Sequence, residues 1–146
     1  YWWGYPMLDL YRHTGDSRYR DAFGRSVRWY AGAMRRDGGI IRDTYLDFNT
    51  DSFGHATSGV GCAVCMFIDH QAIEGGAEMP PLIETGLRYC LRMQFTKPAD
   101  PNLKGAILEK VLRPNGTDDS PYHLRDLGTI FFIQAACRYL AQELPK

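Results

Sequence analysis

The chain has 146 residues, of which 45% are hydrophobic, 23% charged and 13% aromatic, and its formal net charge is zero. This is the composition of a soluble globular domain with its own core, and the balanced charge argues against a nucleic-acid partner, which would need a basic face. The longest uncharged apolar stretch, residues 59–68, is too short to cross a bilayer, so we also expect no membrane partner.

Two helices are predicted in the first 40 residues. The first covers about residues 6–13, because Pro6 suits a first helical position and Gly15 ends the pattern. The second follows Asp16, a good N-cap residue, and its apolar side chains recur at spacings of three and four. Cations and glycines at residues 35–39 end it. We expect this helix to bury one side and expose the other.

The third predicted helix runs from Thr57 to about Ile73 and carries no strongly polar residue between positions 59 and 68. A helix that is apolar on every face is buried on every face. A central β-strand is the alternative, but the length and the Ala, Met and Cys content favour a helix. Gly59 and Gly61 would let neighbouring elements approach this helix closely.

Two further helices complete the pattern. The fourth starts at Pro80 and is again one-sided, whereas the fifth, about residues 124–144, is apolar nearly all round until Arg138. One-sided helices, the second and fourth, therefore alternate with helices that we expect to be buried, the third and fifth. This alternation predicts an all-α fold of helical hairpins in two layers.

The four cysteines lie in apolar, helix-like stretches, so we interpret them as small buried core residues rather than a disulfide framework. Two of them are spaced C-x-x-C, but no second pair follows at zinc spacing, and we expect no metal site. Thiols that stay reduced favour the cytoplasm. The cysteines are Cys62, Cys65, Cys90 and Cys137.

The two long connections between helices, about residues 36–56 and 97–121, resemble each other. Each has a glycine, a short β-prone run, a polar turn, acidic residues and a histidine, and then leads to an apolar helix. Gly39 and Gly105 are 66 residues apart, and Ser58 and Thr129 are 71 apart. These spacings indicate an internal repeat of one helical hairpin with one decorated loop.

The stretch "YWWGYPMLDLYRHTGDSRYRDAFGRSVRWYAGAMRRDGGI" resembles the recurrent helix, Leu-Tyr-x-x-Thr-Gly-Asp, helix, Asp-Gly-Gly unit of the six-hairpin glycosidase-like superfamily. The resemblance covers residues 1–41 best. It implies a single domain, residues 1–146, that forms about two and a half hairpins of an α/α toroid. A start at Tyr1 also suggests a fragment, so the rest of the ring would come from missing chain. The resemblance further implies that ligands bind at the loops that precede the inner helices.

Those loops hold the candidate catalytic residues. Glycoside hydrolysis needs two carboxyl groups, and a lyase needs a base such as Tyr, His or Lys. Asp51 and His55 precede the third helix, and Asp126 lies in the first turn of the fifth, where the helix dipole favours a carboxylate. The alternative is structural: turn formation around Asp51 and helix capping by Asp126.

Further candidates would bind the substrate. Aromatic faces stack on sugar rings, so Trp2, Trp3 and Tyr5 are candidates, unless they simply pack under the loops. Glu109 in the second β-prone run is a weaker catalytic candidate. The polar candidates are Asp43, Tyr122 and Arg125.

The leading hypothesis is a carbohydrate-active enzyme fragment, a glycoside hydrolase that acts on an oligosaccharide by carboxylate acid–base catalysis. The alternatives are the toroid domain of a polysaccharide lyase, with His55 or Tyr122 as the base, and a helical-repeat interaction domain without catalysis. The expected partner is an oligosaccharide or polysaccharide. The chain has no phosphate-binding glycine loop and no other cofactor motif, so we expect no cofactor.

Overall fold

The computed structural model of the chain describes residues 1–52, 54–111, 122–124 and 126–143. The fold class is all-α, as predicted. The described helices form two hairpins and a further helix, and a short two-stranded antiparallel sheet accompanies them. The helices are α1 (Gly4–Thr14), α2 (Ser17–Ala33), α3 (Thr57–Glu74), α4 (Met79–Arg92) and α5 (Asp126–Glu143); a 3-10 turn (Pro101–Leu103), β1 (Leu108–Val111) and β2 (Tyr122–Leu124) lie between α4 and α5.

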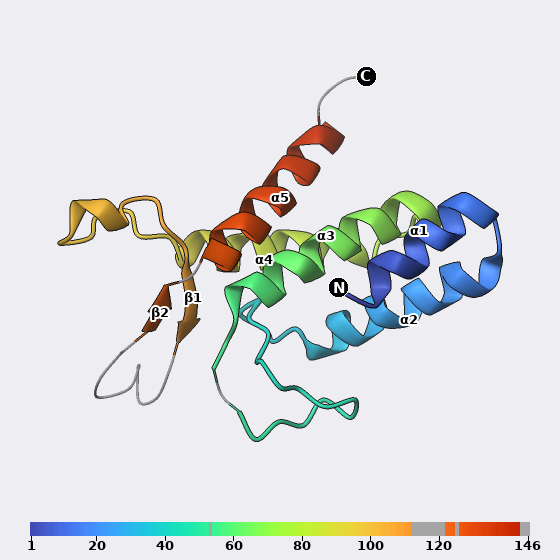
Figure 1. Cartoon of the computed structure of the whole chain (residues 1–146), viewed down its shortest axis with the longest axis horizontal. Helices are drawn as coiled ribbons and strands as arrows, with labels where there is room; N and C mark the ends of the chain where they lie inside the picture. The colour runs from blue at the N-terminus through green and yellow to red at the C-terminus, as the bar shows by residue number, and fades with distance from the viewer. Residues whose placement is uncertain (53, 112–121, 125, 144–146) are drawn as a thin grey trace.

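Local sequence signals set the ends of the hairpins. Asp16 is the N-cap of α2, and its side chain accepts a hydrogen bond from the backbone N–H of Arg18 at 2.9 Å. Gly15 ends α1 with a φ of 71°, and Gly75 ends α3 with a φ of 70°, values that favour glycine. Both hairpins therefore turn within a few residues (Figure 1).

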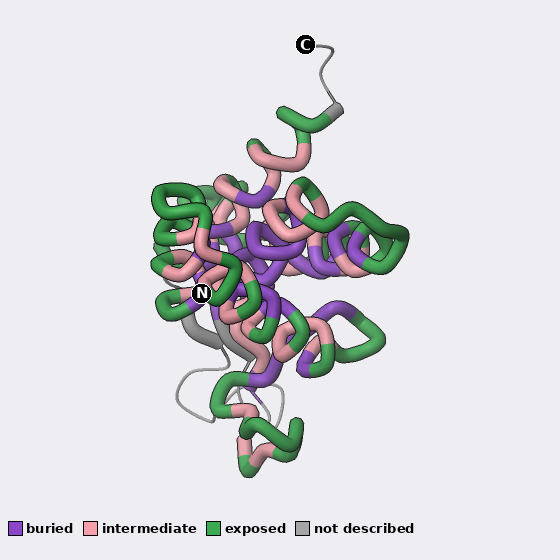
Figure 2. The backbone as a smooth tube through the Cα atoms, turned by 90° about the vertical axis from the view of Figure 1, so that its right-hand side faces the viewer, coloured by how far each residue is buried: buried purple, intermediate pink, exposed green. Residues whose placement is uncertain are grey.

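Helix α3 is the centre of the molecule. It packs against α2, α4 and α5, and every residue from 60 to 68 is buried. Figure 2 shows this buried backbone in the middle of the bundle, with exposed turns and loops around it. The prediction that residues 59–68 form a helix rather than a strand is confirmed, and all of them except the half-buried Gly59 are buried.

Helix α5 differs from its prediction. It buries Phe131 and Ala135, but Ile130, Ile133 and Leu140 are each more than half exposed. The expectation that the fifth helix is buried on nearly all sides is therefore wrong for the described chain. The physical reason is that α5 has α3 and α4 as its main helical neighbours, which cover one side. An apolar pattern predicts that a helix needs cover, but not that cover is present.

Both long connectors leave the helices at the same end. The described residues of the first connector (residues 34–56) and of the second connector (residues 93–125) extend from the end of the bundle opposite the two short turns (Figure 1). Their β-prone runs do form short β contacts: Ile41 pairs with His55 in an isolated bridge, and β1 pairs with β2. The two decorated loops therefore lie on the same side of the described bundle (Figure 1).

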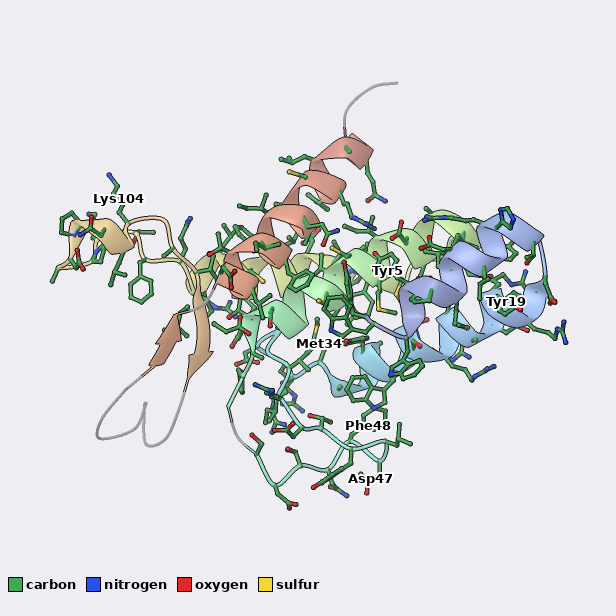
Figure 3. The ribbon with its side chains drawn as sticks, viewed as in Figure 1. Tyr5, Tyr19, Met34, Asp47, Phe48 and Lys104 are labelled. Carbon is green, nitrogen blue, oxygen red and sulfur yellow. The ribbon has the colours of Figure 1, made fainter. Side chains whose placement is uncertain are left out.

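A polar network ties helices α1, α3 and α5 together. Asp69 of α3 accepts hydrogen bonds from the Tyr5 hydroxyl of α1 at 2.6 Å and from Arg12 of α1 at 3.2 Å. Arg138 of α5 also donates to Asp69 and, at 2.6 Å, to the Tyr5 oxygen. Burial, and then the hydrogen bond to Asp69, raise the pKa of Tyr5 far above its usual value. Figure 3 shows Tyr5 on α1 beside the other helices.

The unequal burial of the four cysteines predicts that they differ sharply in their reactivity toward a thiol reagent. Three are buried, and burial raises the pKa of Cys62 and Cys90 to about 12 and that of Cys65 to about 11. Cys137 is exposed, which corrects the expectation that all four lie in the core. Because the thiolate is the reactive form, a disulfide reagent at mildly alkaline pH should modify one thiol per native chain and four in concentrated guanidinium chloride.

The control for this measurement is Cys137→Ser, which should abolish the native reaction and leave three thiols in denaturant. Rapid modification of two or more thiols in the native protein would contradict the buried positions of Cys62, Cys65 and Cys90.

Candidate functional site

The N-terminal ends of α3 and α5 are joined by the first residues of β1 and by Ile107, which precedes it. The Thr57 hydroxyl in the first turn of α3 donates to the Leu108 carbonyl at 2.6 Å. The Ile107 backbone N–H donates to the hydroxyl of Thr129, in the first turn of α5, at 3.3 Å. Residues 107–109 therefore form hydrogen bonds with the first turns of both α3 and α5. This arrangement places the second connector beside the first.

Glu109 is the buried charge at this junction. Its side chain accepts the backbone N–H of Ser58 at 3.0 Å and the Ser58 hydroxyl at 2.5 Å, and the residue is only 8% exposed. It also lies against Gly128, where an added Cβ would come within 2.8 Å of a Glu109 oxygen. A carboxylate beside helix N-termini is stabilised by their dipoles. Glu109 thus caps α3, whose own N-cap residue, Ala56, has no capping side chain.

A cavity of about 330 Å³, here called the acid pocket, opens above Glu109. The last turns of α2, the first connector and the starts of α3 and α5 form its walls. Asp43 lies on the connector side of the pocket with a φ of 63°, and it is exposed. The lining residues are Trp29, Tyr30, Ile40, Ile41, Arg42, Asp43, Thr44, Ala56, Ser58, Gly59, Glu109 and Leu127.

Two further cavities adjoin the acid pocket. The aromatic pocket, about 390 Å³, shares Trp29 and Tyr30 with it and is completed by Tyr1, Trp3, Arg25, Ser26 and Leu46. The arginine pocket, about 650 Å³, shares Thr44 with it and is lined by Gly32, Ala33, Met34, Arg35, Arg36, Asp37, Thr44, Phe48 and His55. All three cavities include residues of the first connector, on which Figure 3 labels Asp47 and Phe48.

The catalytic candidates of the first connector are separated from one another. His55 lines the arginine pocket, and its Nδ1 lies 3.1 Å from the Tyr89 hydroxyl of α4. Burial raises the pKa of Tyr89 well above its usual value. Asp51 is exposed instead, and it accepts a hydrogen bond from the Tyr45 hydroxyl at 2.9 Å. The structure does not bring Asp51 and His55 to one pocket.

The remaining candidates also have different environments. Asp126 lies in the first turn of α5, as expected, and is exposed, but it lines none of the three pockets. Trp3 is 85% exposed and lines the aromatic pocket, whereas Trp2 packs edge-on against Tyr1 and Phe131.

Three predicted substrate-binding residues lie elsewhere. Tyr5 is held inside the bundle by Asp69 and Arg138. Tyr122 is placed by its backbone on β2, opposite Val111, and Arg125 lies outside the described residues.

Sequence reasoning missed Trp29 and Tyr30 as pocket residues, and it gave Glu109 less weight than Asp51 and Asp126. Trp29 and Tyr30 looked like ordinary members of an amphipathic helix. A signal for Glu109 was present, because it is the first charged residue in the short run Ala106-Ile107-Leu108-Glu109, which is otherwise apolar. An acid in an otherwise apolar β-prone run is a candidate for a buried carboxylate that needs polar partners.

No protein-family model, curated protein or solved structure matches the chain. Within the described residues, no helix combines the length and hydropathy that a bilayer span requires. The same residues contain no group of three or more His, Cys, Asp and Glu side chains that could hold a metal ion. The function must therefore be argued from the pockets.

Proposed function

We propose that this chain is part of an α/α toroid of a carbohydrate-active enzyme, a glycoside hydrolase that acts on an oligosaccharide. The observation that carries the proposal is that two pockets share Trp29 and Tyr30 of α2, and that one of them, the acid pocket, lies at the N-terminal ends of α3 and α5. One pocket is lined by Trp3, Trp29 and Tyr30, and the other by the carboxylates of Asp43 and Glu109. Sugar rings are bound by aromatic faces, and glycosidic bonds are cleaved by paired carboxyl groups.

The carboxylates suggest a division of roles. Glu109 is fixed at the base of the acid pocket by Ser58, so it holds the pocket in shape. Asp43 is exposed on the wall and is free to meet a ligand. Hydrolysis needs a second carboxyl group across the scissile bond, and Asp51 and Asp126, on the two flanking connectors, are our candidates for it.

The exposed face of α5 supports the toroid part of the proposal. Ile130, Ile133 and Leu140 form an apolar stripe, and a groove between α4 and α5 adds Leu87, Leu91 and Phe132. Contiguous exposed apolar surface of this kind marks a place where another element packs. We propose that further helical hairpins of the ring cover it.

One observation favours a lyase as the second candidate. His55 lines the arginine pocket and is hydrogen-bonded to Tyr89, an arrangement in which a histidine can take a proton and a tyrosine can hold its ring in place. Tyr89 itself is unsuited to the role of base because burial raises its pKa. A non-catalytic interaction domain is the conclusion if no saccharide binds.

The test is to screen the protein against neutral and acidic oligosaccharides. Hydrolysis releases a new reducing end, whereas elimination produces an unsaturated sugar that absorbs in the ultraviolet. Trp3→Ala should weaken binding about 10-fold, as expected for the loss of one aromatic contact of about 1.4 kcal/mol.

Trp2→Ala is the matched control, because Trp2 is the neighbouring exposed tryptophan but does not line the aromatic pocket. Asp43→Asn, Asp51→Asn and Asp126→Asn then identify the catalytic pair by loss of turnover. If no oligosaccharide binds, or if Trp2→Ala and Trp3→Ala have equal effects, the proposal fails.

A further inference from the structure

The turn after α2 is rigid and displays two arginines. The Arg35 backbone N–H donates to the Gly39 carbonyl at 2.9 Å, and the Gly38 N–H donates to the Arg35 carbonyl at 2.9 Å. The Asp37 side chain accepts the Gly39 N–H at 3.0 Å. These bonds close residues 35–39 into a compact reversal, with Arg36 and Asp37 at its tip.

Helix α4 holds this turn in place. Gly38 has a φ of 91°, and an added Cβ would come within 2.5 Å of the Thr85 carbonyl and 2.9 Å of Tyr89. A Cβ on Gly39 would collide with His55, which is itself bonded to Tyr89. Arg92 also donates to the Asp37 carbonyl. Both glycines are therefore required by close packing, and the arginines project from a fixed base.

The arginine pocket has an unbalanced charge. Arg35 and Arg36 are exposed and line the pocket, and neither guanidinium makes an ion pair within the described residues. One carboxylate, that of Asp37, faces them, and it is engaged by Gly39 and lies 4.0 Å from His55 Nδ1. Two cations thus share a cavity of about 650 Å³ with a single acid.

The other end of the same helix shows the contrast. Arg18 is bound to Asp16 at 2.6 Å, and Arg20 lies 3.3 Å from Asp21 and 3.4 Å from Glu74. Those arginines have carboxylate partners from the protein, whereas Arg35 and Arg36 lack them within the described residues. A guanidinium presents several donors in a planar fork that matches an oxyanion.

We propose that the arginine pocket is an oxyanion-binding site, in which Arg35 and Arg36 bind the carboxylate or sulfate group of a small ligand. The partner is defined by that group, not by the sugar chemistry of the acid pocket, so the inference does not depend on the proposed hydrolase activity. Because α4 holds the backbone of this turn in place, less conformational entropy is lost when the two arginine side chains bind a ligand.

The test titrates inorganic sulfate, sodium glucuronate and neutral glucose into the protein, with binding followed by NMR of the His55 ring and by calorimetry. We expect sulfate, glucuronate or both to bind, and glucose to leave the His55 signals unchanged. The double variant R35Q/R36Q should weaken binding at least 10-fold, the scale of lost charge-assisted hydrogen bonds, and added sodium chloride should also weaken it.

The matched control is R18Q/R20Q, which removes the same charge from the other end of α2, about 20 Å away at 1.5 Å per residue. It should change the affinity less than twofold. Thermal melting of both double variants checks that they fold, since all four positions are at or near the surface. Binding of glucuronate alone identifies a carboxylate site, and binding of sulfate alone identifies a sulfate site.

Three results would overturn the proposal. The first is that neither anion perturbs His55 or produces heat. The second is that R35Q/R36Q binds as tightly as the parent protein, and the third is that R18Q/R20Q loses as much affinity as R35Q/R36Q.

Discussion

Gly61→Ala is expected to lower the free energy of unfolding by about 1–3 kcal/mol, the usual cost of overpacking a well-packed core. Gly61 lies where α3 crosses α5, and an added Cβ would be 2.8–2.9 Å from the backbone carbon and oxygen and the Cβ of Phe131. Backbone atoms cannot rotate away, so the two helices would have to separate. Urea denaturation followed by circular dichroism measures the change as a lower midpoint at constant slope.

Gly59→Ala is the matched control, two residues earlier on the same helix. The nearest atom to its added Cβ is Ala56 Cβ, at 4.0 Å, so the substitution meets no obstacle. Alanine is a better helix former than glycine, and this variant should be unchanged or more stable by up to about 1 kcal/mol. Equal destabilisation by the two substitutions would show that α3 and α5 do not make the close approach described above.

The helices were predictable because their signals are local. Asp16, Gly15 and the apolar spacing of α2 define a hairpin whatever the rest of the chain does. The uncharged stretch at 59–68 likewise predicted a buried helix, because ten consecutive residues without charge leave no face for water. The all-α fold and the position of α3 follow from these patterns.

The surroundings of α5 were not predictable in the same way. Its sequence is largely apolar up to Arg138, yet Ile130 and Ile133 are exposed, and so is Cys137. Hydropathy describes what a side chain prefers, whereas burial depends on which other elements lie next to it. The pattern in one segment does not specify which elements those are.

The sequence did not predict how the candidate residues of the first connector are arranged. Asp43, Asp51 and His55 lie in a loop, as the sequence predicts, and the described residues of 34–56 contain no helix. His55 is positioned by Tyr89, 34 residues away, and Asp43 by a left-handed backbone. Long-range contacts of this kind determine the conformation of an irregular loop, and a single sequence does not reveal them.

The second large effect on stability is expected from substitutions of Glu109. Glu109→Ala is expected to destabilise the protein by about 3 kcal/mol, because it removes a buried side chain and leaves the Ser58 N–H without its acceptor. Glu109→Gln keeps the shape and one acceptor oxygen, so it should cost only about 1 kcal/mol, the difference between a charged and a neutral hydrogen bond near a helix N-terminus.

Comparing the free energies of unfolding of Glu109→Ala and Glu109→Gln separates the effect of capping from the effect of charge. If the carboxylate mainly holds α3 to β1, hydrogen exchange should show loss of protection at Ser58 and at residues 107–109 in Glu109→Ala, and much less loss in Glu109→Gln. Glu84→Ala is the control: Glu84 is exposed and 3.8 Å from Arg88, so its removal should cost less than about 0.5 kcal/mol. If Glu109→Ala lowers the free energy of unfolding as little as Glu84→Ala does, the packing of the second connector against α3 does not depend on Glu109. The acid pocket would then lack the fixed base on which its proposed chemistry rests.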